Sequence, residues 1–289
     1  MPRYVYLLLL TISLISCDQV ASTRTPQLEA SETIQGSEII LENLVIAPGD
    51  FQDLHASGMA FLPEGLTPDS NSTEGTFTSS PIIAPIKFNA VVPQWKIDQS
   101  ENSTLQMEMR TGTDPATLGE WIQIHSSEDW TLPEDDHVVG DMLIVPAQET
   151  THEYVQYRVI LSRNDGQSGP LLRELQFTFI DSTDGLSVEE MILRQEEINR
   201  DQGQTQDLAA EEATGYPKPF VISREVWCND PACSYSENLD YYSVSHLLLH
   251  HTVTSTGADG DSAAAVRAIW VFHTSGRGWR DIGYNYLVD

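Results

Sequence analysis

The chain has 289 residues, and its 40% apolar content is ordinary for a globular protein long enough to hold two domains. Forty-three acidic residues against fifteen basic residues give a formal net charge of -28. A nucleic-acid backbone is bound by a stripe of basic residues that this sequence lacks, so the composition argues against nucleic acid as a partner and is typical of an exported, salt-tolerant protein.

Residues 1–17 have the pattern of a secretion signal. Arg3 precedes an apolar run, Tyr4 to Ile15, that is too short to remain as a membrane span. The run leads into Leu14-Ile-Ser-Cys17, which resembles the bacterial lipoprotein signal, and the resemblance implies cleavage before Cys17 and attachment of lipid to its sulfur. The alternative is an ordinary cleaved signal peptide with a coincidental cysteine. We expect a lipoprotein anchored in the membrane at the bacterial cell surface or in the cell envelope.

Two further regions follow the signal. Residues 18–36 are rich in Ser, Thr, Gln and Glu without a period, which is typical of a flexible tether. Residues 37–182 consist of short alternating segments separated by turn residues, which predicts an all-β sandwich of jelly-roll type.

Alternation of apolar and polar residues is clearest in three segments of the predicted sandwich, Thr104–Arg110, Val155–Leu161 and Leu175–Phe179. The turn residues Asn164 to Pro170 join the last two of these predicted strands. The polar stretch from Pro68 to Ser80 is predicted to be an excursion loop.

Aromatic residues of the sandwich could form a platform on which sugar rings stack; they are Trp95, Trp121, Trp130 and Tyr154. The alternative is that they pack in the core or at its rim. A carbohydrate partner for the sandwich follows only from the first interpretation, by analogy of fold.

Residues 183–215 are predicted to be a partly helical, acidic linker that ends at a domain boundary near Tyr216. Ser187-Val-Glu-Glu190 has the spacing of a capping box, and it opens an amphipathic helix that carries Met191, Ile192 and Ile198.

Cys228 and Cys233 are the only cysteines besides Cys17, and Pro231 between them can turn the chain so that the two thiols meet. In an oxidising compartment the expected state is a disulfide. A pair of metal ligands is the alternative, although no second Cys/His pair accompanies them.

The C-terminal region begins with an unbroken apolar run, Leu247 to Leu249, which predicts a strand buried on both faces. His250 and His251 lie at its end, where such strands present reactive groups. Since adjacent strand residues point to opposite faces, the two histidines are not expected to share one ion.

A helix and a second strand are predicted after the histidines. Asp261 or Ser262 can cap a helix that begins at Ala263, and its residues Val266, Ile269, Trp270 and His273 form one face that packs on a sheet. Gly276 and Gly278 end this helix. Trp279 to Val288 alternates as a strand should, with Tyr284 on the face that also carries Ile282.

The order of these motifs resembles one protein family. His250-His-Thr252, a helix ending in Phe272-His273, and the run Arg277 to Val288 are similar to the first half of the zinc-dependent N-acetylmuramoyl-L-alanine amidases, which share a fold with peptidoglycan recognition proteins. Val221 to Trp227 resembles the opening segment of that family, Ser-Arg-x-x-Trp-Gly. The resemblance covers residues 216–289 and implies an α/β domain with a mixed sheet.

The resemblance also implies a zinc site. Zinc with three protein ligands and one open position polarises an amide carbonyl and activates water. The family motif makes His250 a zinc ligand and places the Tyr284 hydroxyl near the zinc-bound water or the developing oxyanion. A strand tyrosine buried for its area is the alternative for Tyr284. His251 and His273 are interpreted as packing residues or neighbours of the site, and His246 as structural.

One departure from the family pattern shapes the functional expectation. The remaining zinc ligands of the family, a second His and then a Cys or Asp, come much later, and no His or Cys follows Tyr284 here. We therefore expect residues 1–289 to be the N-terminal part of a longer protein. Alone they should bind zinc weakly, hydrolyse muropeptide negligibly, and leave Leu247–Leu249 and the Trp270 face poorly covered.

The functional expectation is an exported peptidoglycan amidase that cleaves the bond between N-acetylmuramic acid and L-alanine. The alternatives are a non-catalytic peptidoglycan-binding module and a sugar-binding surface lipoprotein.

Overall fold

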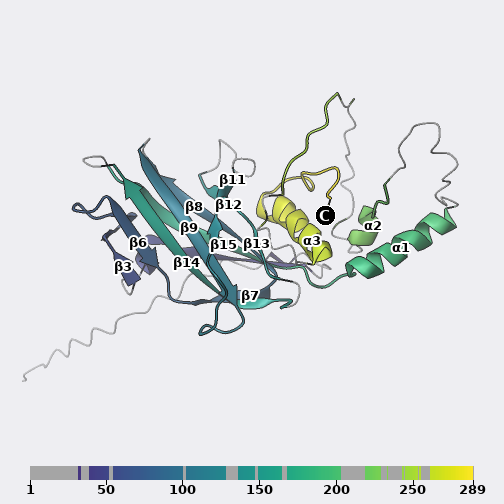
Figure 1. The fold of residues 1–289 in the computed structure, drawn as a ribbon, viewed down its shortest axis with the longest axis horizontal. Coiled ribbons are helices and arrows are strands. Elements are labelled where there is room, and N and C mark those ends of the chain that lie inside the picture. The colour runs from purple at the N-terminus through teal and green to yellow at the C-terminus, as the bar shows by residue number, and fades with distance from the viewer. Residues whose placement is uncertain are drawn as a thin grey trace, which may run out of the picture.

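The computed structural model describes residues 32–33, 39–51, 55–99, 102–127, 136–146, 149–164, 168–202, 219–228, 233, 243, 245–252, 254 and 261–288. Two antiparallel sheets pack face to face in this part of the chain, and the helices gather beyond one end of them (Figure 1). The predicted signal with Cys17 lies outside the described residues. No helix in the described part of the chain is long and apolar enough to cross a membrane.

The larger sheet has the strand order β1-β2-β15-β8-β12-β11, with β13 beside β8 and the β4–β5 pair beside β15. Its strands are β1 (Glu32–Thr33), β2 (Ile40–Ile46), β4 (Met59–Leu62), β5 (Gly65–Pro68), β8 (Ala90–Asp98), β11 (Ser126–Ser127), β12 (Val138–Gly140), β13 (Leu143–Ile144) and β15 (Leu171–Asp181). A short 3-10 turn, η1 (Pro48–Asp50), follows β2.

The smaller sheet has the order β10-β9-β14-β6-β3, with β7 also paired to β14. Its strands are β3 (Ala56–Ser57), β6 (Glu74–Thr78), β7 (Ile82–Phe88), β9 (Ser103–Gly112), β10 (Ile122–Ile124) and β14 (His152–Arg163).

The core between the two sheets confirms the three predicted alternating segments. Met107 and Met109 of β9, Tyr157 of β14, and Phe177 and Phe179 of β15 are all buried in it. The Tyr157 and Phe177 ring centres lie 5.4 Å apart across the two sheets. Since β14 and β15 belong to different sheets, the connection between them carries the chain from one sheet to the other.

The predicted excursion loop from Pro68 to Ser80 is wrong, because β6 lies within it and pairs with β14. Phe77 is the only large apolar side chain that β6 contributes to the core. The neighbouring inward position is Gly75, where an added Cβ would lie 2.5 Å from the Gly58 carbonyl oxygen. A close backbone crossing therefore requires glycine here, and it hides the apolar alternation that would reveal the strand.

The predicted capping box is confirmed. Helix α1 (Val188–Asp201) begins after Ser187, whose hydroxyl accepts a hydrogen bond from the Glu190 amide at 3.3 Å, while the Glu190 carboxylate accepts one from the Ser187 amide at 2.9 Å. Met191 is buried, whereas Ile192 is exposed. A single-turn helix, α2 (Arg224–Trp227), follows in the chain and contacts α1.

Helix α3 (Ser262–Val271) lies at one end of the sheets (Figure 1), where its side chains pack on the outer face of the larger sheet. The predicted cap is confirmed, because an Asp261 carboxylate oxygen accepts hydrogen bonds from the amides of Ala263 and Ala264. Trp270 is only 5% exposed and shares a buried cluster with Val92 and Ile180 of the sandwich. The expectation that the Trp270 face would be poorly covered is therefore wrong.

Neither strand predicted for the C-terminal region forms. Leu247, Leu248 and Leu249 are 96%, 87% and 99% exposed, and neither they nor residues 279–288 belong to a sheet. A strand exists only where another strand pairs with it, and the described residues after 216 contain one β pairing, an isolated parallel bridge between Thr254 and Met142. The predicted mixed α/β sheet is absent from this described part.

Replacing Trp270 with alanine should lower the free energy of unfolding by about 3 kcal/mol or more, because it empties a large volume between α3 and the larger sheet. Leu248→Ala is the matched control, because that side chain is exposed and its removal opens no cavity. Urea denaturation of both variants checks this expectation, and equal stability of the two would contradict the described packing.

Candidate functional site

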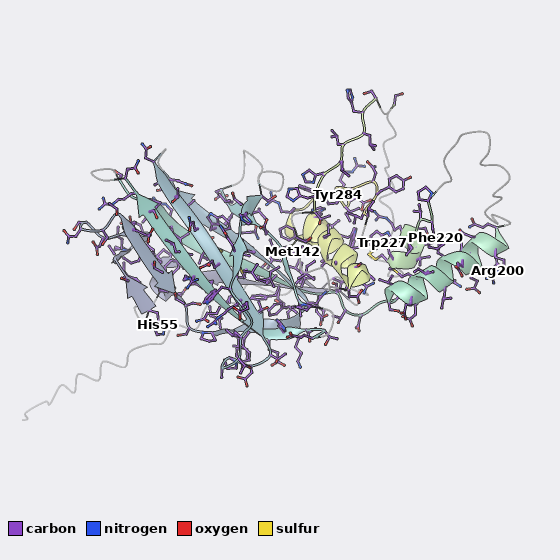
Figure 2. The ribbon with its side chains drawn as sticks, viewed as in Figure 1. His55, Met142, Arg200, Phe220, Trp227 and Tyr284 are labelled. Carbon is purple, nitrogen blue, oxygen red and sulfur yellow. A yellow bond between two sulfur atoms is a disulfide. The ribbon has the colours of Figure 1, made fainter. Side chains whose placement is uncertain are left out.

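Aromatic rings from three separate segments of the chain meet beside α3, those of His250 and His251, of His273, and of Tyr284. The ring centres of His250 and Tyr284 lie 6.0 Å apart, those of Tyr284 and His273 lie 5.8 Å apart, and those of His250 and His251 lie 5.0 Å apart. Tyr284 lies on the segment that runs back beside α3 (Figure 2). The structure thus brings together His250 and Tyr284, the two residues that the sequence motif assigned to one site.

The end of α3 produces the chain reversal that places Tyr284. The helix continues into a π-helical turn, η5 (Phe272–Gly276), and Gly278 then adopts a φ of 69°, a conformation that suits glycine. At Gly283 an added Cβ would lie 2.9 Å from the Trp279 ring, so a larger residue would require the ring to shift. The glycines of the motif therefore serve the local backbone geometry.

His273 is the buried member of the cluster, at 1% exposure. Its Nδ1 accepts a hydrogen bond from the Gly283 amide at 3.1 Å, which leaves the ring proton on Nε2 in the neutral form. Burial, together with the nearby charge of Arg277, lowers the pKa of His273 to about 4. The ring is therefore neutral at pH 7 and anchors the reversed segment.

His250, His251 and Tyr284 form the accessible side of the cluster. Both histidines are exposed, and the Tyr284 hydroxyl donates a hydrogen bond to the His251 carbonyl oxygen at 3.2 Å. The prediction that the two histidines point to opposite faces is wrong, because this segment is not a strand and their rings lie side by side. His246 is exposed and its Nδ1 contacts the Ser245 hydroxyl at 2.8 Å.

A catalytic zinc ion requires three protein donors. Within the described residues, no three His, Cys, Asp or Glu side chains are grouped so that they could hold a metal ion. The described residues therefore do not by themselves fit a catalytic zinc site, and His250 stands as a single candidate ligand with His251 beside it.

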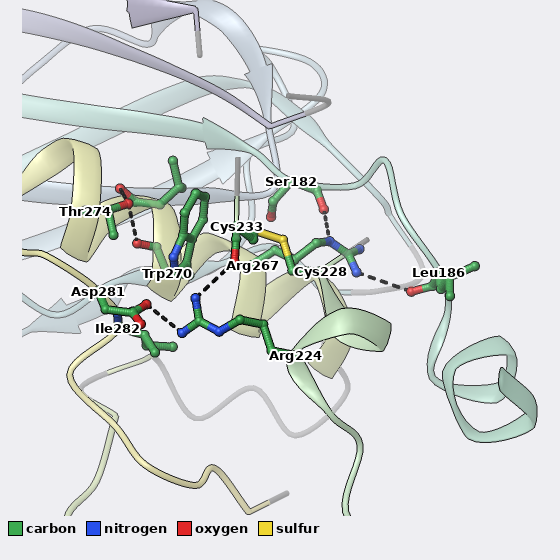
Figure 3. The surroundings of a disulfide bond; sticks show 11 residues. Ser182, Leu186, Arg224, Cys228, Cys233, Arg267, Trp270, Thr274, Asp281 and Ile282 are labelled. Atoms are coloured by element: carbon green, nitrogen blue, oxygen red, sulfur yellow. Dashed lines mark hydrogen bonds and ion pairs between the residues drawn. A yellow bond between two sulfur atoms is a disulfide. The ribbon is translucent and has the colours of Figure 1, made fainter. Parts of the chain in front are cut away.

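The predicted disulfide between Cys228 and Cys233 is confirmed, with the two Cα atoms 5.9 Å apart and both residues buried. Sequence reasoning missed the contacts around it (Figure 3). Arg224 donates hydrogen bonds to the Cys233 carbonyl oxygen at 3.1 Å and to the Asp281 carboxylate at 2.6 Å. Arg224 and Asp281 both lie within motifs of the family resemblance, which is the signal that could have paired them.

Trp95 cannot be part of the predicted sugar-stacking platform. Trp95 is 4% exposed and belongs to the core between the sheets, so it cannot contact a ligand. Trp121 precedes β10, and the guanidinium carbons of Arg110 and Arg158 lie 4.5 and 4.7 Å from its ring centre. Trp130 lies outside the described residues.

Comparison with models of known protein families, with curated proteins and with solved structures found no match to this chain. The order of the sequence motifs and the geometry of the cluster around Tyr284 are therefore the features that bear on function.

The low pKa of His273 should make stability depend on pH. The unfolded chain protonates this ring near pH 6.5, whereas the folded chain does so only near pH 4. The stabilisation is therefore fully present above about pH 6.5 and is lost as the pH falls toward 4, by at most about 3 kcal/mol.

Urea denaturation between pH 4 and 7 measures this effect, with His273→Asn as the matched variant because its side-chain oxygen can still accept the Gly283 hydrogen bond but does not titrate. The difference in unfolding free energy between the two proteins should shift in favour of the variant as the pH falls. A difference that stays constant with pH would contradict the assigned protonation state.

Proposed function

We propose that this chain is an exported lipoprotein that acts on bacterial peptidoglycan, and that residues 216–289 belong to an N-acetylmuramoyl-L-alanine amidase domain. The observation that carries the proposal is the proximity of His250 and Tyr284, whose ring centres lie 6.0 Å apart although the motifs that contain them are separated by all of α3. The motif resemblance pairs these same two residues in one site.

The proposed substrate is the amide that joins the lactyl group of N-acetylmuramic acid to L-alanine. In its hydrolysis, water adds to the carbonyl carbon, the C–N bond breaks, and the alanine nitrogen leaves as an amine after taking up a proton. The carbonyl oxygen gains negative charge as water adds, and a hydrogen-bond donor placed beside it lowers the barrier. Tyr284 carries such a donor, which in this structure donates to the His251 carbonyl oxygen at the accessible side of the cluster.

A non-catalytic peptidoglycan-binding module is the second candidate. It is favoured by the donor set, because the described residues do not group three metal-binding side chains. In that case His250 and Tyr284 would contact the muramoyl peptide without cleaving it.

Binding and cleavage of a muropeptide separate these candidates. The mature chain should bind N-acetylmuramoyl-L-alanyl-D-isoglutamine in isothermal titration calorimetry, and His250→Ala should weaken that binding about tenfold or more, the effect of losing a hydrogen bond to a polar ligand. Release of L-alanyl peptide from purified peptidoglycan in the presence of zinc, by a chain extended to the family's full length, favours the amidase, whereas binding without release by that extended chain favours the recognition module.

Tyr284→Phe distinguishes a role in the reaction from a role in binding. If the chain hydrolyses the amide, this variant should keep its affinity and lose rate by about 100-fold, the usual effect of removing one oxyanion donor. Tyr286→Phe is the matched control, because that side chain is 75% exposed and lies two residues further along the same segment. A chain that binds no muropeptide, or binds it equally well without His250, would rule out the proposed site.

The proposed anchor is tested by Cys17→Ala. The wild-type protein should fractionate with membranes and carry a lipid-modified N-terminal cysteine in mass spectrometry, because two or three acyl chains hold a protein firmly in a bilayer. The variant should leave the membrane fraction. An unmodified N-terminus at another residue would remove the lipid from the proposal.

A further inference from the structure

The segment that carries Tyr284 has no regular structure of its own. Residues 279–288 belong to neither a helix nor a sheet, so individual contacts set their position. Contacts at the start of the segment include the Trp279 amide with the His273 carbonyl oxygen at 2.9 Å, the Gly283 amide with His273 Nδ1 at 3.1 Å and the Arg224 guanidinium with the Asp281 carboxylate at 2.6 Å. The last of these joins two opposite charges.

Arg224 holds this segment from a half-buried position on α2. Its side chain is 11% exposed and that of Asp281 is 27% exposed, so water screens the pair less than it screens a surface ion pair. The guanidinium carbon lies 5.3 Å from the centre of the Trp227 ring. One guanidinium nitrogen contacts Asp281 while another contacts the Cys233 carbonyl oxygen at 3.1 Å, as drawn in Figure 3. A planar, forked group is needed to hold both acceptors at once.

Asp281 links the Arg224 guanidinium to the backbone near Tyr284. The same carboxylate oxygen that binds Arg224 accepts a hydrogen bond from the Ile282 amide at 2.7 Å. The backbone that leads into Gly283 and Tyr284 is therefore fixed relative to the Arg224 guanidinium. Loss of the guanidinium would leave the carboxylate partly buried without its charged partner.

The other end of the contact depends on a covalent bond. The Cys233 carbonyl is held near Arg224 because the Cys228–Cys233 disulfide joins Cys233 to the residue that directly follows α2. Reduction of the disulfide removes this restraint on the carbonyl and so weakens the hydrogen bond between Arg224 and the Cys233 carbonyl oxygen.

We propose that Arg224 is a positioning residue that couples the Cys228–Cys233 disulfide to the segment bearing Tyr284. The disulfide thereby sets the position of Tyr284 relative to His250 through the Cys233 carbonyl, the Arg224 guanidinium and the Asp281 carboxylate. The relevance of this coupling to ligand binding rests on the proposed function, whereas the coupling itself does not.

Hydrogen–deuterium exchange of the mature chain, read by mass spectrometry on peptides that cover residues 279–288, tests the coupling. In the wild-type protein, reduction with dithiothreitol should speed exchange in this segment about tenfold, the effect of losing one hydrogen bond to a charged group. Arg224→Gln should speed exchange by at least as much without reduction, and reduction should then add nothing further. Arg224→Lys, which keeps the charge but not the fork, should give an intermediate rate.

Arg194→Gln is the matched control, because Arg194 forms an exposed ion pair with Glu197 on α1. This variant should exchange like the wild type and respond fully to reduction. Peptides from β14 and β15 should exchange at an unchanged rate in every variant, which separates a local effect from unfolding. Equal acceleration by reduction in the wild type and in Arg224→Gln would overturn the coupling through Arg224, as would the absence of any response to reduction.

The affinity for N-acetylmuramoyl-L-alanyl-D-isoglutamine separates this inference from the proposed function. Reduction and Arg224→Gln should each weaken binding, and together they should weaken it no more than Arg224→Gln alone. If exchange responds as expected while no binding is detected in any state, the coupling stands and the proposed function fails. If binding is detected and yet responds to neither change, the role of Arg224 in positioning the site is wrong.

Discussion

The C-terminal region depends on the docking of α3 against the larger sheet, and this docking depends on a buried polar contact at the end of β15. The Ser182 hydroxyl donates to the Ala264 carbonyl oxygen at 2.8 Å, and Arg267 donates to the Ser182 carbonyl oxygen at 3.0 Å. The Asn89 side chain also binds Ser182, with its oxygen accepting from the Ser182 amide at 2.8 Å. Arg267 is 2% exposed, and a charge so deeply buried must keep its hydrogen bonds. These hydrogen bonds therefore help to fix the position of the helix on the sheet.

The docked helix makes the two sheets unequal. The central strands of the larger sheet are buried on both faces, with Val91 and Phe179 toward the core and Val92 and Ile180 toward α3. The smaller sheet instead carries polar contacts on its outer side, such as the hydrogen bond from Arg110 to Gln156 at 2.8 Å. Tyr284 packs against the buried cluster that α3 and the larger sheet share.

The features that were predicted correctly from the sequence are those that local residue patterns determine. The capping box at Ser187, the cap at Asp261, the disulfide, and the inward faces of β9, β14 and β15 each depend on residues close together in the chain or on a short period. The meeting of His250 and Tyr284 also followed from the sequence, although through the resemblance of motifs rather than through local physics. The strand β6 was missed because a backbone crossing replaces one of its inward side chains with Gly75.

Contacts between distant segments could not be predicted in the same way. The run Leu247 to Leu249 shows that apolar residues are adjacent, but it does not say whether another strand pairs with them, and here they are exposed. The amphipathic face of α3 predicted burial correctly but not the surface that buries Trp270. The ion pair between Arg224 and Asp281 joins a short helix to an irregular segment. The periodicity of apolar residues does not predict such a contact.

The pairing of β2 with β15 determines how the molecule would carry a mechanical load. Ile40 at the start of β2 lies opposite Asp181 at the end of β15, so the start of one strand and the end of the other lie at the same end of the larger sheet. A pulling force applied between Ile40 and Asp181 would separate these strands by peeling, which opens hydrogen bonds one after another. Ile39 and Leu41 belong to the same buried cluster as Trp270 and Ile180. The helix that covers the sheet therefore also clamps the end at which peeling would begin.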